Sequence, residues 1–491
     1  MTSPTPPADG PPPQVNAPIN GYTIMVAVVA ALGGLLFGFD TGVISGAMLY
    51  IEPYFDLKDA PNTVGWIVAG VVLGAIFGSA VGGKLADAVG RRRLVIITAV
   101  MFALGSLGCA YAPAVEWLIA GRVFLGLAIG VASCVAPLYI SEMAPPQIRG
   151  GLVSLNQLMI TIGIVFSYAV DYGFSVLEEN GTLTAGQAWG WMLGFGAIPA
   201  VVLGVGMMLL PDSPRWLAAK GRRADAERTL KKIRGTEDVS GEMAEIDESL
   251  KEASEESKSD WSELARPWLR PLLIVGIGLG IFQQFSGINT VIYYAPTIFK
   301  MAGYESDSVA ILATAGVGLL NVIMTVVAVF LMDRVGRRPL LLIGLTGMCI
   351  SLIALGGAFY ANPPDAAGQV TGTALPIICL ASLLLYVGSF AISLGPIFWL
   401  LISEIYPTKI RGLAMGLATM IQWGANLAVT QSFPNLIATL DPFGTFWLFG
   451  GLCVAALLFS YILMPETKGV TLEEIEEHCR AGKPLGALGK G

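Results

Sequence analysis

The strongest constraint on this chain is a series of long apolar stretches, nearly free of charge, that recur along its length. Each is long enough for the ~20 residues that a helix needs to cross a bilayer. Closed barrels are the other way to span a membrane, but their strands of about ten alternating residues do not match these stretches. We therefore predict an all-α polytopic membrane protein with twelve transmembrane helices, at about 22–47, 63–83, 94–115, 117–141, 150–177, 188–210, 271–299, 308–332, 339–361, 373–403, 412–440 and 442–464.

Composition excludes several other classes of protein. Charged residues make up only 13% of the 491 residues and hydrophobic residues 54%, whereas about 25% charge is usual in soluble domains. A soluble enzyme, a nucleic-acid-binding protein and a disordered scaffold are all excluded on this ground. We expect a lipid bilayer as the surroundings and no nucleic acid as a partner.

The basic residues predict which side of the membrane each loop occupies. With the N-terminus inside, the inner loops and the tail hold 26 of the 29 Lys and Arg residues, the outer loops hold Lys58 and Lys300, and Arg122 lies within a span. Cytoplasmic loops are enriched in Lys and Arg. We therefore expect a multi-pass protein of the plasma membrane with both termini in the cytoplasm.

The two halves of the chain repeat each other. ISEMAPPQIRG (140–150) matches ISEIYPTKIRG (402–412) at seven of eleven positions, DAVGRR (87–92) matches DRVGRR (333–338), and PDS (211–213) resembles PET (465–467). Parallel repeats of six spans place a substrate path between the halves, near the midplane of the membrane. The predicted organisation is a disordered cytoplasmic arm (1–21), two six-helix halves (22–210 and 270–465), a charged helical linker between them (211–269) and a cytoplasmic tail (466–491).

Seven separated motifs give the chain a family resemblance. They are GGLLFGFD (33–40), the GRRR and VGRR loops after spans two and eight, PDSPRWL after span six, QQFSGIN (283–289), GPIFWLLISEIYP (395–407) and PETKG after span twelve. In this combination the chain resembles the sugar porter family of the major facilitator superfamily over about residues 22–470. Asp212 departs from the Glu usual in that family but keeps the carboxylate.

Two ionisable residues lie deepest in the predicted spans. Asp40 on span one and Arg122 on span four are both roughly 10 Å below the outer surface, at 1.5 Å per residue, so they can meet. A static ion pair between two helices is one interpretation. The other is a proton switch, in which Asp40 is protonated when separated from Arg122 and ionised when paired with it. The resemblance favours the switch, because proton-coupled sugar porters carry Asp at this place and facilitative animal carriers carry Asn.

A cluster of amides midway along span seven is suited to binding a sugar. Gln283, Gln284 and Asn289 surround Ser286-Gly287. Each amide offers donors and an acceptor to sugar hydroxyls, and a neutral amide costs less to bury than a charge. Amides in spans also simply join helices, but the resemblance favours substrate binding, with Tyr293 closing an outer gate.

Further site residues are implied by the resemblance. By this resemblance, the sugar hydroxyls would be bound by Gln157, Asn321 and Gln422. Trp399 would offer an apolar face to the sugar ring, and Phe37 is a candidate for the opposite wall of the pocket. Gly395 and Pro396 let the helix that carries Trp399 bend. Ile164 would shape the pocket with an apolar surface.

Charged residues at the inner ends of the spans are predicted to form a cytoplasmic latch of salt bridges between the halves. The alternative is that they only obey the positive-inside rule. Acidic residues repeated in both halves favour the latch, whose members are Arg91, Arg92, Glu142, Arg149, Arg215, Arg337, Arg338, Glu404, Arg411 and Glu466.

These residues predict proton-coupled uptake of a monosaccharide by alternating access. An uncoupled facilitative carrier is the nearest alternative, and a transporter-like sugar sensor is a further one. The identity of the sugar is left open, between a hexose such as glucose and a pentose such as xylose. We expect no enzymatic activity, no catalytic residues, no metal, no cofactor other than the coupling proton, and function as a monomer. Asn180 begins an Asn-Gly-Thr glycosylation sequon, which chance also explains.

Overall fold

The computed structural model describes residues 21–145, 148–255, 261–363, 373–407, 410–470, 472–485 and 488. Within these ranges the regular secondary structure is helical and no strand occurs. The predicted arm at 1–21 lies outside the described residues, apart from Gly21 at the start of the first helix.

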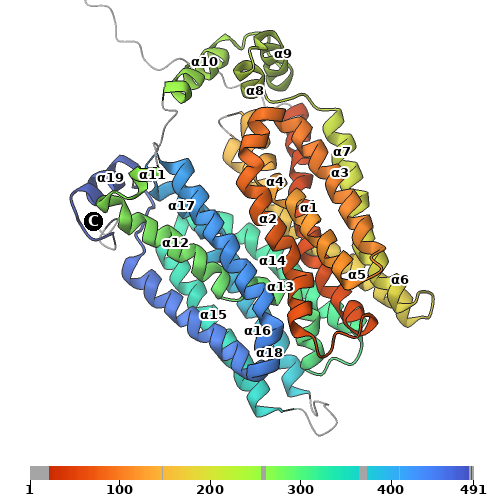
Figure 1. Ribbon diagram of the computed structural model, residues 1–491. Coiled ribbons are helices and arrows are strands. Elements are labelled where there is room, and N and C mark those ends of the chain that lie inside the picture. The colour runs from red at the N-terminus through yellow and green to blue at the C-terminus, as the bar shows by residue number, and fades with distance from the viewer. Residues whose placement is uncertain are drawn as a thin grey trace, which may run out of the picture.

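The amino-terminal half forms one bundle, which runs from red to yellow in Figure 1. The predicted spans are found, and several extend by one or two turns beyond their apolar cores. The helices are α1 (Gly21–Tyr54), α2 (Pro61–Val89), α3 (Arg91–Ala110), α4 (Val115–Met143), α5 (Arg149–Glu179), α6 (Ala185–Phe195) and α7 (Ala197–Met208).

The carboxy-terminal half forms a second bundle beside the first, from green to blue in Figure 1. Its helices are α12 (Arg270–Phe285), α13 (Ile288–Met301), α14 (Asp307–Val335), α15 (Arg337–Ala361), α16 (Ala374–Ile392), α17 (Leu394–Ile405) and α18 (Arg411–Leu463).

Eleven helical segments among the described residues are long and apolar enough to cross a membrane. The last of them, α18, contains two predicted spans. They are separated at Asp441, whose backbone is non-helical (φ 58°, ψ 170°) and which is followed by Pro442. This interruption falls between the predicted spans 412–440 and 442–464. Twelve spans in two halves therefore account for the described bundle.

Three predicted spans are broken within their length. Span six divides at Gly196 into α6 and α7, span seven at Ser286-Gly287 into α12 and α13, and span ten at Ser393 into α16 and α17. Gly287 has a φ of 88°, which an L-residue with a side chain rarely adopts. The Tyr386 hydroxyl donates to the Ser286 carbonyl at 2.8 Å, which satisfies a backbone group at the break.

Glycine allows helices of one bundle to approach closely. At Gly74 on α2 an added Cβ would collide with the backbone of α4, and at Gly126 on α4 it would collide with the backbone of α2. Small residues at such crossings are typical of membrane helices, whose association depends on van der Waals contact. The high glycine content, 60 of 491 residues, is used in part for this purpose.

Short helices cover one end of the bundles, which we call the inner end because it carries the basic loops. The linker contains α8 (Pro214–Ala219), α9 (Arg223–Arg234), α10 (Ser240–Glu255), α11 (Trp261–Leu264) and η1 (Pro267–Leu269), and the tail contains α19 (Leu472–Arg480). Helices α8–α10 lie over the first bundle, whereas α11 and α19 lie beside the second (Figure 1).

The linker is attached to the first bundle through the end of α9. The Arg234 guanidinium donates to the carbonyls of Met143 at 2.8 Å and Ala144 at 3.4 Å, at the C-terminus of α4. Thr23 on α1 donates to the Ile233 carbonyl at 2.8 Å. Arg234 thereby satisfies carbonyls that the end of a helix leaves without intrahelical partners.

Contacts between the bundles gather towards the opposite, outer end. Glu179 at the end of α5 accepts hydrogen bonds from Ser308 near the start of α14, at 3.1 Å from the amide and 2.8 Å from the hydroxyl. Tyr168 on α5 donates to the Ile292 carbonyl on α13 at 3.1 Å. Gln431 on α18 donates to the Asn62 side chain on α2 at 2.5 Å. The outer end is therefore closed in this conformation.

Candidate functional site

Asp40 and Arg122 form a buried ion pair between α1 and α4. Arg122 Nη1 lies 2.6 Å from Asp40 Oδ1, and the two residues are 1% and 3% exposed, respectively. Arg122 Nε also donates to the Ile67 carbonyl on α2 at 3.3 Å. The sequence predicts the same depth in the membrane for both residues, and in the structure their side chains are in contact.

The second oxygen of Asp40 distinguishes this pair from a fully satisfied salt bridge. Asp40 Oδ2 is buried and has no hydrogen-bond partner among the described residues. A buried carboxylate is stabilised when its lone pairs are satisfied and its countercharge is close. Here only one oxygen is paired, so loss of the Arg122 contact would leave a carboxylate that favours binding a proton.

The amides of span seven form a hydrogen-bonded row that continues onto α18. Asn289 Nδ2 donates to Gln284 Oε1 at 2.7 Å, and Gln284 Nε2 to Gln283 Oε1 at 3.3 Å. Gln422 Nε2 on α18 donates to the same Gln283 oxygen at 3.0 Å. Gln422 Oε1 is buried without a partner among the described residues, so the row ends in a free acceptor.

Gln283 also joins this amide row to the broken span ten. Its Nε2 donates to the carbonyls of Leu394 at 3.1 Å and Gly395 at 3.2 Å, at the start of α17. The predicted bend of this helix is present, but it falls at Ser393, just before Gly395 and Pro396. Trp399 lies one turn further along α17 and is 40% exposed.

On the amino-terminal half, Gln157 lies on the face of α5 that is directed towards the second bundle. Gln157, Thr161, Ile164 and Tyr168 share one helical face by spacing, and Tyr168 contacts α13. Gln157 is exposed, whereas the other three side chains, further out, are buried. The space beside this face is thus open on the inner side of Gln157 and closed beyond it.

The remaining predicted pocket residues occupy both bundles. Phe37 on α1 contacts Trp423 on α18, with ring centroids 6.0 Å apart. Asn321 on α14 is 9% exposed, and Tyr293 on α13 is 5% exposed. Tyr293 lies on the same short helix as Ile292, which receives the Tyr168 hydrogen bond across the bundles.

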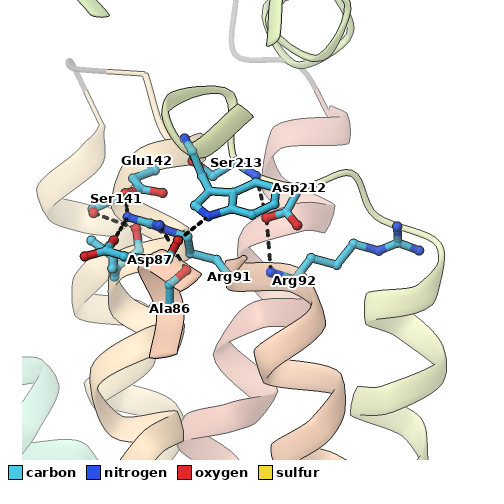
Figure 2. A network of polar contacts seen from close by, with 10 residues as sticks. Ala86, Asp87, Arg91, Arg92, Ser141, Glu142, Asp212 and Ser213 are labelled. Carbon is cyan, nitrogen blue, oxygen red and sulfur yellow. Dashed lines mark hydrogen bonds and ion pairs between the residues drawn. The ribbon is translucent and has the colours of Figure 1, made fainter. Parts of the chain in front are cut away.

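At the inner end of the first bundle, Arg91 is the centre of a polar network (Figure 2). Its Nη2 lies 3.0 Å from Glu142 on α4 and 3.0 Å from Asp87 on α2. Asp212 Oδ1 accepts a hydrogen bond from the Arg92 amide at 3.3 Å, at the start of α3. The Asp212 carboxylate therefore caps the positive end of this helix.

The second bundle repeats the network with its own residues. Arg337 Nη2 lies 2.9 Å from Glu404. The carboxylate of Glu466 accepts from the backbone amides of Arg337 at 3.1 Å and Arg338 at 3.0 Å, at the start of α15. Asp212 and Glu466 thus occupy equivalent positions, which is the atomic counterpart of the PDS and PET repeat.

The ion pairs of these residues run within each half in this conformation. Arg91–Glu142 and Arg337–Glu404 each lie within one half, whereas the predicted latch between the halves concerns the state in which the inner side is closed. The physical reason is that the arginine loop and the inner end carrying the glutamate both belong to the same repeat, so the two meet inside it.

The other latch residues are placed less directly. The Arg92 guanidinium donates to the carbonyls of Met207 at 3.1 Å and Met208 at 2.5 Å. Arg411 donates to the Tyr406 carbonyl at 3.2 Å, and Arg215 is exposed. The side chain of Arg149 lies outside the described residues.

Comparison with known families decides which proteins this fold is related to. Residues 26–478 match the family profile described as "Sugar (and other) transporter". The chain belongs to this sugar transporter family. The twelve spans in two halves are the major facilitator fold, as the motifs predicted.

Curated relatives of this family member agree over nearly the whole chain. A D-xylose transporter of Levilactobacillus brevis is 43% identical over 94% of this chain and 96% of its own length. A galactose-proton symporter of Escherichia coli (strain K12) is 41% identical over 95% of this chain and 96% of its own length.

A solved structure gives the same fold and indicates the conformation. The inward-open form of the xylose transporter XylE from E. coli is 34% identical, with a TM-score of 0.78 over 93% of this chain and 99% of that one. The same symporter bound to 6-bromo-6-deoxy-D-glucose gives 0.73 over 93% and 98%, at 36% identity. The similarity to the inward-open form is consistent with the closed outer end of this family member.

Some polar residues that the structure brings together or buries are not among the predicted site residues. Glu179 and Ser308 are joined across the bundles, although no motif marks either of them. Asp212 is a departure from the family motif and is not a predicted site residue. The PDS–PET repeat is the sequence pattern that could have indicated its contact with the start of α3. Asp171, a second acid within a span, is fully buried on α5.

Proposed function

We propose that this sugar transporter family member carries a monosaccharide into the cell together with a proton. Coupling would run through Asp40 and Arg122, with alternating access across the plasma membrane, both termini in the cytoplasm, the monomer as the working unit and no cofactor beyond the proton. The observation that carries this proposal is the buried Asp40–Arg122 pair, in which one carboxylate oxygen has no partner within the part of the chain that the structure describes.

The sugar would bind between the bundles, along the amide row. Gln283, Gln284, Asn289 and Gln422 offer neutral donors and acceptors at hydrogen-bonding distance of one another. Trp399 would cover the C–H face of the sugar, and Gly395 with Pro396 would allow α17 to adjust. The remaining wall would come from Gln157, Asn321, Phe37 and Ile164, with Tyr293 as the outer gate.

Hexoses and pentoses are both candidate substrates. The relatives carry names for D-xylose, galactose and glucose transport, and the apolar Ile164 favours a hexose only weakly. A membrane potential supplies ~2.3 kcal/mol per charge per 100 mV. One coupled proton would therefore drive about fiftyfold accumulation at that voltage.

The inner-end network would act as the latch of the cycle. In this conformation its ion pairs stay within each half, as expected when the inner side has opened. We infer that the same charged residues meet across the halves when the inner side closes, with Glu142 and Glu404 exchanging arginine partners. Arg92, Arg149, Arg215, Arg338, Arg411 and Glu466 would support that arrangement.

The decisive experiment measures sugar uptake and proton movement in proteoliposomes that contain the purified protein. A panel of labelled sugars is tested with and without a protonophore, in the wild type, in Asp40→Asn, and in Asp59→Asn as an exposed outer control. We expect Asp40→Asn to lose uphill uptake and sugar-driven proton entry while it retains sugar exchange. Unchanged accumulation in Asp40→Asn would overturn the coupling role, and uptake insensitive to the protonophore in the wild type would indicate the uncoupled facilitator.

A further inference from the structure

A second carboxylic acid lies inside the membrane-spanning part of the first bundle, outside the proposed coupling pair. Asp171 on α5 is 0% exposed, and neither of its carboxyl oxygens has a hydrogen-bond partner among the described residues. Its carboxyl group lies against Gly46 on α1, where even an added Cβ would collide with it. No countercharge reaches this position in the described contacts.

The surroundings of Asp171 seal it from water on both sides along the α1–α5 contact. On the outer side, the hydroxyls of Tyr50 and Ser175 are bonded to each other at 2.6 Å. On the inner side, the Ser45 and Ser167 hydroxyls each donate to a carbonyl of their own helix. These four hydroxyls are bonded to each other or to backbone carbonyls, and none of them is bonded to the Asp171 carboxyl.

An ionised carboxylate at this place would be costly. A charge in the membrane interior costs at least ~2.5–3.5 kcal/mol, and an unpaired buried polar group adds to that cost. This cost disfavours the ionised form of Asp171 in the conformation whose outer end is closed.

The position of Asp171 connects it to the closure of the outer end. It lies three residues after Tyr168 and eight before Glu179, and both of those residues bond to the second bundle. At 3.6 residues per turn, Asp171 points about 60° away from Tyr168 around the helix. It therefore lies at the border between the α1 contact and the face that α13 and α14 cover.

Opening of the outer end would separate both contacts and admit water to this segment of α5. A solvated aspartate is ionised at neutral pH. We propose that Asp171 is a second proton-binding group, protonated when the outer end is closed and ionised when it is open. This proposal rests on the alternating access proposed above but not on coupling through Asp40.

The sign of the resulting pH dependence follows from linkage. The closed state binds one proton more than the open state, so closure is favoured as external pH falls, by up to about tenfold per pH unit. Protonation of Glu179 would have the opposite effect on closure of the outer end. Its carboxylate accepts the Ser308 hydrogen bonds, and protonation would weaken them.

Other titratable groups lie on the helices around Asp171. The elements packed against this part of α5 are α1, α4, α6 and α14, and the described sequence of α6 contains no titratable residue. The titratable and charged groups on α5 itself, on these neighbours and on the adjoining α13, within the outer half of the bundle, are Asp40, Tyr50, Glu52, Tyr54, Glu116, Arg122, Tyr168, Tyr172, Glu178, Glu179, Tyr293, Tyr294, Lys300 and Asp307.

The test measures the distance between spin labels at the outer ends of the two bundles as a function of pH. Labels are attached at Asp59→Cys and Thr439→Cys in a Cys134→Ser background, in full-length protein in lipid nanodiscs. We expect the long-distance, open population to grow between pH 5.5 and 8 in the wild type and to stay low across this range in Asp171→Asn. Glu116→Gln, which neutralises an exposed outer acid, should respond as the wild type does.

An Asp171→Asn protein that keeps the wild-type pH response would overturn the proposal, and so would a wild type without one. If Asp171→Asn does not fold, Asp171→Ser offers a smaller neutral side chain for the same measurement. Infrared spectra in an Asp40→Asn background test the protonated carboxyl directly, and its band should disappear when Asp171 is also replaced. Asp40→Asn should keep the pH-dependent distances but lose sugar-driven proton entry, so failure of the coupling proposal is seen separately.

Discussion

The carboxylate of Glu179 accepts both the backbone amide and the hydroxyl of Ser308, at 3.1 and 2.8 Å. This contact joins the end of α5 to the first turn of α14, so it connects the two bundles at their outer end. Because the amides in the first turn of a helix have no intrahelical acceptor, an acid from the other half stabilises them only while the outer end is closed.

Replacing Glu179 with Ala should shift the transporter towards the outward-open state. Ser308 is buried and Glu179 is exposed, so the contact is partly buried, and we expect a loss of about 1 kcal/mol, or roughly fivefold in the equilibrium. Distances between outer spin labels measure the change. Glu178→Ala, one residue earlier, is the matched control; equal effects of the two substitutions would contradict the specific role of Glu179.

Arg122→Gln should destabilise the first bundle strongly, because it leaves the Asp40 carboxylate buried without its countercharge. Breaking a buried pair by removing one partner costs about 3–5 kcal/mol. The double substitution Asp40→Asn/Arg122→Gln should recover part of this loss. Thermal unfolding in detergent provides the measurement, and a double variant no more stable than Arg122→Gln would argue against direct pairing.

Asn289→Ala should weaken sugar binding while leaving the fold intact. Asn289 is at the end of the amide row, where its side chain donates to Gln284, so a lost sugar hydrogen bond of about 1.4 kcal/mol would reduce affinity about tenfold. Gln283→Ala should reduce both affinity and Tm, since Gln283 also holds two carbonyls of α17. Equilibrium binding of labelled sugar and thermal unfolding separate the two effects. Full affinity in Asn289→Ala would remove it from the site.

Asp212→Ala and Glu466→Ala should reduce stability by similar amounts. Each carboxylate caps the first turn of a helix at the inner end, and loss of a cap costs about 0.5–2 kcal/mol. Thermal unfolding of both variants, with Glu248→Ala on the linker as an exposed control, tests the equivalence. A large effect in one half alone would mean that the two networks are not equivalent.

Arg234→Ala should release the linker from the first bundle. This guanidinium caps the C-terminus of α4 and pairs with Glu242 at 2.5 Å. We expect faster cleavage of the linker in limited proteolysis, while Arg228→Ala, an exposed substitution on the same helix, should be cleaved at the wild-type rate. Equal cleavage of the two variants would show that Arg234 does not hold the linker.

Local properties of the chain were sufficient to predict the spans, their sidedness and the repeat. Whether a segment enters a bilayer depends on its own apolar length, and its orientation depends on the Lys and Arg residues next to it. The meeting of Asp40 and Arg122 was also predictable, because depth follows from residue count along a helix. The amide row of span seven was marked by residue type, although its continuation to Gln422 came only from the resemblance.

Partner choice and conformation were not contained in these local patterns. The repeated Arg and Glu residues predicted ion pairs, but only tertiary packing decided that Arg91 meets Glu142 and Arg337 meets Glu404 within each half. Glu179, Ser308 and Asp171 carry no motif, since their roles arise from helices far apart in the sequence that touch in one state of the cycle. The sequence by itself therefore determined which segments are able to cross the membrane, because partition into lipid is a local property. Only the tertiary structure decided which buried charges are paired and which end is closed, because those depend on how two bundles pack against each other.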